Sequence, residues 1–120
     1  MPVIEDFQLG YCIGLSLAGV VPVCIFPRMD FMLLAANQLI NHLDKLPLFG
    51  WAPKVIIRAR VGTKHPLDAG PQHTQNYRKE FDTMTCSVQV REVCTAMEVR
   101  AAYKEALAGA RSYLIVENIQ

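Results

Sequence analysis

Charged side chains are scarce in this 120-residue sequence. Asp, Glu, Lys and Arg make up 19% of it, and the formal net charge is only +1. Soluble domains usually carry about 25% charged residues. A chain without a strongly basic or acidic balance gives no sign of binding nucleic acid or an anionic membrane, so we expect neither as a partner. With 52% hydrophobic residues, two interpretations stay open: a second subunit covers apolar surface, or the chain is a well-packed monomer.

Closely spaced cysteine pairs are also missing. The four cysteines are scattered, with no C-x-x-C motif, at Cys12, Cys24, Cys86 and Cys94. Three of them lie in apolar stretches, which is typical of reduced, buried thiols. Because disulfides are rare in reducing compartments, this usage predicts a cytoplasmic protein.

Targeting and membrane segments are not recognisable either. No basic region precedes an apolar stretch at the amino terminus, so a signal peptide is not expected. The longest apolar run, residues 15–26, is interrupted by Pro22 and is too short to cross a bilayer. The sequence shows no internal repeat, low-complexity tract or second domain.

Hydrophobic periodicity predicts alternating helices and strands. Helices are expected at 7–18, 31–46 and 95–107, and strands at 20–26, 54–61, 86–90 and 113–117. Residues 62–77 have no apolar period and predict a long loop, which in a compact domain is often functional. The alternation predicts one α/β domain over residues 1–120, with three layers and a mostly parallel, flavodoxin- or Rossmann-like sheet covered by helices on both faces.

The first expected helix is apolar on nearly all sides, so we predict that it is buried. Gly10 and Gly14 lie one turn apart and share a face, where another backbone can approach closely. Pro22 fits only an early or irregular place in a strand, since it cannot donate to a sheet.

Two polar residues are expected to cap later helices. Asp30 precedes the second helix and is a candidate N-cap. Thr95 and Glu98 have the spacing of a capping box, in which each side chain satisfies a backbone donor near the other. His42 and His65 fit no pattern and are expected in solvent.

Several motifs along the chain resemble one known family. The opening reads P-x-x-E-x(4)-G-x-x-I-G-x(4)-G-x-x-P from Pro2 to Pro22. Asp30-Phe31 then opens a helix, Gln72-His73-Thr74-Gln75 lies in the long loop, and Glu117-Asn118 closes the last strand. The set resembles the pyrimidine-binding domain of transketolase-type thiamine-diphosphate enzymes, in particular the beta subunit of the first component of 2-oxoacid (pyruvate and branched-chain) dehydrogenases.

The resemblance implies a role for four residues. Glu5 matches the glutamate that activates the cofactor by binding a ring nitrogen of its aminopyrimidine, and Val3 belongs to the apolar surroundings that suit such a carboxyl. Phe31 matches the aromatic residue that stacks on the pyrimidine. His73 matches a loop histidine near the substrate, which can donate to a carboxylate or acyl oxygen. Each has a plainer alternative: a solvated glutamate at a helix start, a core phenylalanine and a surface histidine.

The implied cofactor is thiamine diphosphate, with its magnesium held elsewhere. In this family the diphosphate and magnesium belong to another domain, usually on the alpha subunit, and no Gly-Asp-Gly…Asn motif occurs here. We therefore expect no metal ligands in the chain, and a homo- or hetero-oligomer with a diphosphate-binding partner. Leu34 stands where several members have a polar active-site residue. Residues 108–111 lack the acidic residue that holds a structural cation in some members, so such a site is not expected.

The implied function is one half of an active site. The complete enzyme would decarboxylate and dehydrogenate a 2-oxo acid, or carry out a related ketol transfer, and the chain would be inactive alone. Family beta subunits have a further strand and helix before the glutamate and a further domain after this region, so we expect a fragment or a small separate subunit. The main alternative is a non-catalytic interaction module with the same fold. A flavodoxin-like nucleotide binder would need a glycine-rich turn after the first strand, which is missing.

Overall fold

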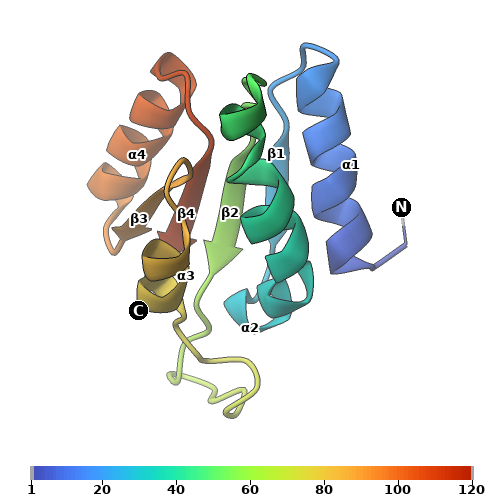
Figure 1. Cartoon of the computed structure of the whole chain (residues 1–120). Helices are drawn as coiled ribbons and strands as arrows, with labels where there is room; N and C mark the ends of the chain where they lie inside the picture. Colours follow the sequence, from blue (N-terminus) through green and yellow to red (C-terminus); the bar gives the residue numbers. More distant parts are fainter. Residues whose placement is uncertain (1, 120) are drawn as a thin grey trace.

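Four apolar segments form a parallel sheet at the centre of the computed structural model, which describes residues 2–119 (Figure 1). The sheet order is β1-β2-β4-β3, and every neighbouring pair is parallel. The strands are β1 (Val23–Phe26), β2 (Ile56–Arg60), β3 (Gln89–Val93) and β4 (Tyr113–Glu117). The two central strands are the most deeply buried, and all five residues of β4 are buried, as expected for strands covered on both faces.

Helices cover both faces of this sheet, which confirms the predicted three-layer α/β domain. The long helices are α1 (Glu5–Leu17) and α4 (Ala96–Ala108), and the short ones are α2 (Met29–Met32), η1 (Leu33–Ala35), η2 (Gln38–Leu43), η3 (Leu46–Phe49) and α3 (Arg78–Met84). On one face, a large core joins α1, α2, η1, η2 and α3 to the sheet around Phe26, Ile57 and Leu114. On the other, α4 alone packs Ala102 and Ala106 against Ile115.

The helix α1 is buried on one side only, contrary to the prediction. Leu9 and Ile13 face the core, whereas Phe7, Tyr11 and Leu17 are each roughly half exposed. The Phe7 and Tyr11 rings stack on each other with centroids 6.0 Å apart. An apolar helix has no polar face to turn towards solvent, so burying one side leaves the other apolar side uncovered in the single chain.

The two glycines of α1 have no other backbone against them. A side chain added at Gly10 would meet the side chain of Gln38 at 3.3 Å, and Gly14 faces open space. Among residues 2–119, the expected close approach of a second backbone at these positions is therefore not found.

Pro22 lies just before β1, as its chemistry requires. It sits outside the strand, and its carbonyl accepts a hydrogen bond from the Ile56 amide at 3.0 Å. β1 is an edge strand with β2 as its one neighbour in the sheet, so the missing N–H of Pro22 leaves no strand on the other side without a donor. The strand is consequently shorter than the predicted 20–26.

The third strand begins later than predicted, at Gln89 rather than at residue 86. The buried carboxylate of Asp44 accepts hydrogen bonds from the backbone N–H groups of Cys86, Ser87 and Val88, at 2.7–3.0 Å. These donors are therefore turned towards a helix end and not towards β4. The apolar and polar alternation at 86–90 correctly indicated a strand, but it could not reveal that the Asp44 carboxylate binds these amides in place of a neighbouring strand.

The predicted helix at 31–46 is helical but irregular. It begins at Met29, changes its hydrogen-bonding pattern through η1 and η2, and is followed by η3. The N-cap position is Arg28 and not Asp30. The prediction for Asp30 was wrong because its carboxylate oxygen Oδ1 instead accepts the amide of Gln75, a residue of the long loop, at 3.4 Å.

Helix α3 was not predicted. It is only seven residues long, and its single buried residue is Phe81. Two pairs of residues spaced four apart indicate a helix here: the aromatic residues Tyr77 and Phe81, and the ion pair of Arg78 with Asp82, whose Nη2 and Oδ2 atoms are 3.0 Å apart. So short a segment has too few turns for periodicity to stand out. The loop before it, the capping box at Thr95 and the exposed positions of His42 and His65 agree with prediction.

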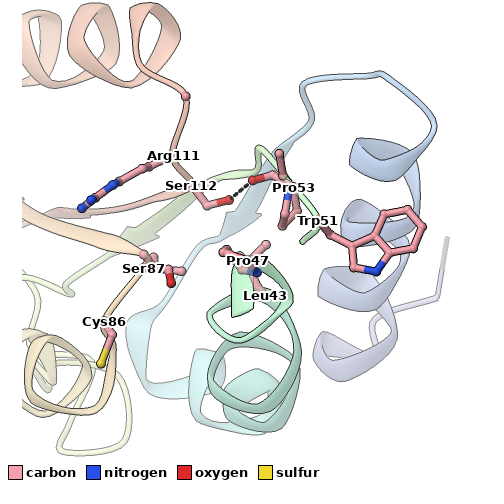
Figure 2. A pocket seen from close by; sticks show the side chains of 11 residues that line it. Leu43, Pro47, Trp51, Pro53, Cys86, Ser87, Arg111 and Ser112 are labelled. Carbon is pink, nitrogen blue, oxygen red and sulfur yellow. Dashed lines mark hydrogen bonds between the residues drawn. The ribbon is translucent and has the colours of Figure 1, made fainter. Parts of the chain in front are cut away.

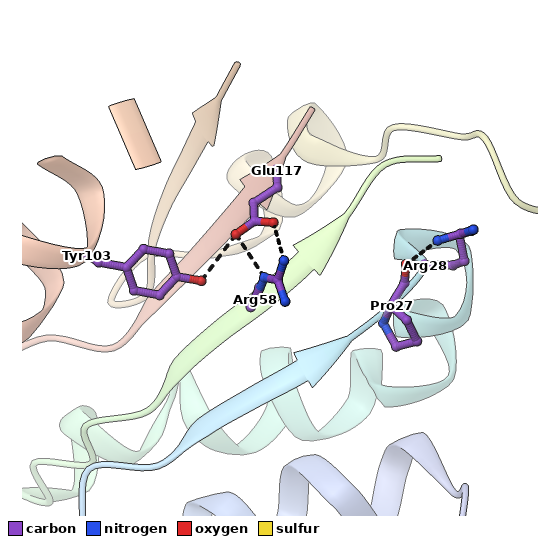
Figure 3. A network of polar contacts seen from close by, with 5 residues as sticks. All are labelled: Pro27, Arg28, Arg58, Tyr103 and Glu117. Carbon is purple, nitrogen blue, oxygen red and sulfur yellow. Dashed lines mark hydrogen bonds and ion pairs between the residues drawn. The ribbon is translucent and has the colours of Figure 1, made fainter. Parts of the chain in front are cut away.

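A polar network ties β2 to β4 on the face that carries α4 (Figure 3). The Arg58 guanidinium donates to both oxygens of Glu117, at 2.8 and 2.7 Å, and the Tyr103 hydroxyl lies 3.5 Å from the same carboxylate. Glu117 is buried, and its hydrogen bonds raise the pKa of Arg58. The terminal Glu-Asn motif behind the family resemblance is thus joined to β2 by a bidentate ion pair.

The cysteines are only partly as predicted. All four are free thiols, but Cys86 and Cys94 are exposed while Cys12 and Cys24 are buried. Burial, together with the neighbouring Cys12, raises the pKa of Cys24 to about 12. Cys94 follows the end of β3 and Cys86 lies outside any strand, so the apolar sequence around them does not bury them.

Candidate functional site

The predicted site residues converge at one edge of the sheet, where the strands end. Phe26 is the last residue of β1, and the chain continues through Pro27 into α2, which carries Phe31. Glu5 opens α1 close to the same edge, and the long loop leaves β2 there (Figure 1). In open α/β sheets, ligands bind in the crevice outside the carboxyl ends of the strands.

Three of the predicted residues line one cavity. Its volume is about 360 Å³, and its walls are Val3, Glu5, Gln8, Phe26, Pro27 and Phe31. Glu5 is half-buried, Val3 is 88% exposed, and Phe31 is 37% exposed. Apolar walls with a single carboxylate suit a small heterocycle that combines a flat apolar face with one polar ring edge. We call this cavity the Glu5 hollow.

The Glu5 carboxylate has no partner of its own. Among residues 2–119, no side chain or backbone group donates a hydrogen bond to it, and no cation pairs with it. Its neighbour Asp6, in the same first turn of α1, has Gln38 as a partner at 3.5 Å. The Glu5 carboxylate is therefore available to a ligand in the hollow.

Gln8 fixes the first turn of α1 against the sheet. Its side-chain amide donates to the Ile25 carbonyl at 2.8 Å and lies 3.5 Å from the Cys24 sulfur. Because Gln8 is one turn from Glu5, this tie orients the carboxylate relative to the end of β1. Sequence reasoning had not assigned it a role; the available signal was a polar residue inside an otherwise apolar helix.

His73 lies beside Phe31. The two rings meet edge to face, with centroids 5.3 Å apart and planes at 80°. This is a favourable aromatic geometry. The ring of Phe31 consequently borders the Glu5 hollow and also contacts the loop histidine, so the other three predicted residues lie around this one side chain.

A second cavity adjoins Phe31, with a volume of about 470 Å³. It is lined by residues of α2, η1, the long loop and the start of α3, namely Asp30, Phe31, Leu33, Leu34, Pro71, Gln72 and Tyr77. The Asp30 oxygen Oδ2 is buried and has no hydrogen-bond partner among the described residues. Leu34 is 63% exposed here, so the polar residue that the family resemblance places at this position is replaced by an apolar surface.

A further hollow lies at the opposite edge of the sheet, before the strands begin (Figure 2). It measures about 260 Å³ and is lined mainly by apolar residues, with Cys86, Ser87, Arg111 and Ser112. The Ser112 hydroxyl donates to the Pro53 carbonyl and accepts from the Val55 amide, so it is occupied in holding the chain together. The histidines lie elsewhere, so no general base faces Ser87 or Cys86 in this lining.

Metal ligands and membrane spans are not found in the described part of the chain. Residues 2–119 contain no cluster of three or more His, Cys, Asp or Glu side chains that could hold a metal ion. Within the same residues, no helix is both long and apolar enough to cross a bilayer.

The proteins to which the chain is similar are beta subunits of pyruvate dehydrogenase. The "Pyruvate dehydrogenase E1 component subunit beta" of Cyanidium caldarium is 28% identical over 98% of this chain. The mitochondrial subunit of Chaetomium thermophilum is 25% identical, and a chloroplastic subunit of Arabidopsis thaliana is 26% identical, each also over 98% of the chain. No protein-family profile matches.

The chain spans about a third of the length of these curated relatives, between 29% and 36% of each. The family resemblance inferred from the motifs is thereby confirmed, since the relatives are beta subunits of this dehydrogenase component over nearly the whole chain. Their similarity indicates the context of a thiamine-diphosphate enzyme.

Proposed function

We propose that the chain forms the pyrimidine-binding half of a thiamine-diphosphate site, in an enzyme that decarboxylates a 2-oxo acid or carries out a related ketol transfer. The observation that carries this proposal is the free carboxylate of Glu5, which lines the same apolar hollow as Phe31. A carboxylate and an aromatic side chain that line the same small cavity suit an aminopyrimidine. The curated relatives support the same assignment.

Each residue of the hollow has a task in this proposal. Glu5 would hold the proton that it shares with a ring nitrogen of the bound pyrimidine, and Phe31 would orient the ring by its face. Val3 and Pro27 would give the bound ring apolar contact on one side. When bound, thiamine diphosphate supplies the carbon nucleophile and the electron sink for the reaction.

His73 would act at the substrate end of the site. Its ring contacts Phe31, so the imidazole would lie next to a pyrimidine bound on that aromatic ring, where an N–H can donate to a carboxylate or acyl oxygen. We therefore assign His73 to substrate binding and proton transfer.

The diphosphate requires a partner. The Glu5 hollow contains a carboxylate and no cationic side chain, so a diphosphate group would be repelled there. With no metal-binding cluster in residues 2–119, the magnesium ion would also be held by the partner. A diphosphate-binding domain or an alpha subunit fits this need, and the assembly would be an oligomer.

A non-catalytic interaction module is the second candidate. The exposed apolar side of α1, with Phe7, Tyr11 and Leu17, favours it because such a surface serves association without any chemistry. The exposed apolar side chain of Leu34, at a position where the resemblance implies a polar residue, also favours an interaction module. This candidate predicts association with a partner but no dependence on Glu5.

Calorimetric titration of thiamine diphosphate and magnesium distinguishes the two. We would titrate the chain alone and the chain purified together with a pyruvate dehydrogenase alpha subunit. Binding is expected only in the assembly. Glu5→Gln should weaken it by about 10- to 100-fold, because a hydrogen bond to a charged group contributes roughly 1.5–3 kcal/mol.

Asp6→Asn is the matched control. It removes the same charge from the same helical turn, but Asp6 contacts Gln38 and does not line the hollow. Equal binding by wild type and Asp6→Asn, with weaker binding by Glu5→Gln, supports the proposal. Association with the alpha subunit but unchanged cofactor binding in Glu5→Gln would favour the interaction module instead.

A further inference from the structure

The loop that carries His73 crosses the end of β2 at Gly62. This glycine is buried, two residues beyond the strand. A side-chain carbon added there would overlap the carbonyl oxygen of His73, and would lie 3.0 Å from the carbonyl carbon and 3.5 Å from the Cα of Thr74. All three are backbone atoms, so no rotation of a side chain can make room.

Both sides of this crossing are held by other contacts. On the sheet side, the Val61 amide donates to the Glu117 carbonyl at 2.9 Å, which extends the pairing of β2 with β4 up to Gly62. On the loop side, the Gln75 amide donates to Asp30 at 3.4 Å. A substitution at Gly62 leaves the donors and acceptors of both hydrogen bonds in place.

We propose that Gly62 is a positioning residue that sets His73 against Phe31. The backbone contact at Gly62 fixes where the returning arm of the loop lies, and the imidazole projects from that arm onto the Phe31 ring. An added methyl group must push the His73 carbonyl outward, and the ring moves with it. The importance of this placement for catalysis rests on the proposed function; the placement itself does not.

Proton NMR of the chain tests the inference without any cofactor. In the wild type, we expect nuclear Overhauser effects between the Gly62 and Thr74 α-protons and between the His73 and Phe31 rings. The His73 ring signals should differ from those of His42 and His65, which are exposed and serve as internal references. Gly62→Ala should abolish the ring-to-ring effect and move the His73 signals towards the reference histidines.

Gly14→Ala is the matched control, because it adds the same methyl group at a glycine with nothing within 4 Å. It should leave the His73 signals unchanged. Missing Overhauser effects in the wild type would overturn the inference, whatever the variants do. So would an intact His73–Phe31 contact in Gly62→Ala. Loss of the folded sheet in that variant would also overturn it, since Gly62 would then support the fold and not the histidine.

The result is separable from the proposed function. Failure of thiamine diphosphate to bind would refute that function and leave the ring contact unaffected, because the NMR measurement contains no cofactor. Conversely, an unaltered His73 signal in Gly62→Ala would leave the binding role of Glu5 standing.

Discussion

Replacing Asp44 by alanine should destabilise the protein more than any exposed substitution. The Asp44 carboxylate is buried and accepts the backbone N–H groups of Cys86, Ser87 and Val88. The Val88 donor is itself buried, at 2.8 Å from the carboxylate, so water cannot replace the lost acceptor there. The other two donors are partly buried and can be hydrated.

The expected loss follows from these three bonds. An unsatisfied buried donor costs about 1–3 kcal/mol, and a hydrated one costs roughly 0.5–1 kcal/mol. The sum is about 2–5 kcal/mol, a large fraction of the roughly 5–15 kcal/mol that separates folded and unfolded states of such a domain. With about 4 °C per kcal/mol for a domain of this size, the midpoint of thermal unfolding should fall by about 8–20 °C.

Two further variants sharpen the measurement by urea and thermal unfolding. Asp44→Asn keeps a carbonyl oxygen in the place of Oδ1, which accepts all three amides, so it should lose only about 1–2 kcal/mol. Asp82→Ala removes an exposed carboxylate paired with Arg78 at 3.0 Å and should lose about 0.5 kcal/mol or less. A loss below about 1 kcal/mol in Asp44→Ala would refute the reasoning.

Two predictions concern titrating groups. In mildly alkaline solution, iodoacetamide should modify the exposed Cys86 and Cys94 rapidly. The buried Cys12 and Cys24 should react only after unfolding, because burial raises the pKa of both thiols. Mass spectrometry of partly labelled protein measures the four rates, and equal rates would contradict the prediction. The capping-box carboxylate of Glu98 has a lowered pKa, because backbone N–H groups beginning with that of Cys94 donate to it. The stabilisation of the folded state by ionised Glu98 is therefore present above the ordinary pKa of about 4.5 and is lost as the pH falls through the lower pKa of the folded state. The difference in thermal midpoint between wild type and Glu98→Gln should shrink in acid. A difference that stays constant with pH would exclude this cause.

Local sequence was sufficient to predict secondary structure wherever the stabilising contacts join residues that are close in sequence. The capping box of α4 joins Thr95 to Glu98, three residues apart, and it forms as predicted. The segments that became β2 and β4 contain the apolar runs 55–57 and 113–116, which favoured a strand at both places. The alternation of such runs with helical segments was enough to predict a parallel sheet with helices on both faces.

The roles of the site residues remain predictions, although their placement is now known. The family resemblance singled out Glu5, Val3, Phe31 and His73, and the fold brings the other three around the ring of Phe31. The cytoplasmic location predicted from cysteine usage is likewise still a prediction.

Tertiary structure decided what depends on contacts distant in sequence. Asp44 withdraws the amides of residues 86–88 from the sheet, so β3 starts at Gln89 and not where the pattern begins. The backbone contact at Gly62 fixes a loop eleven residues further on, which no periodicity encodes. The chain by itself determined the type of the four strands and of the two long helices, because those choices follow from propensity and pattern. Only packing determined which face of α1 stays uncovered and where His73 meets Phe31, because both depend on which segments compete for the same buried space.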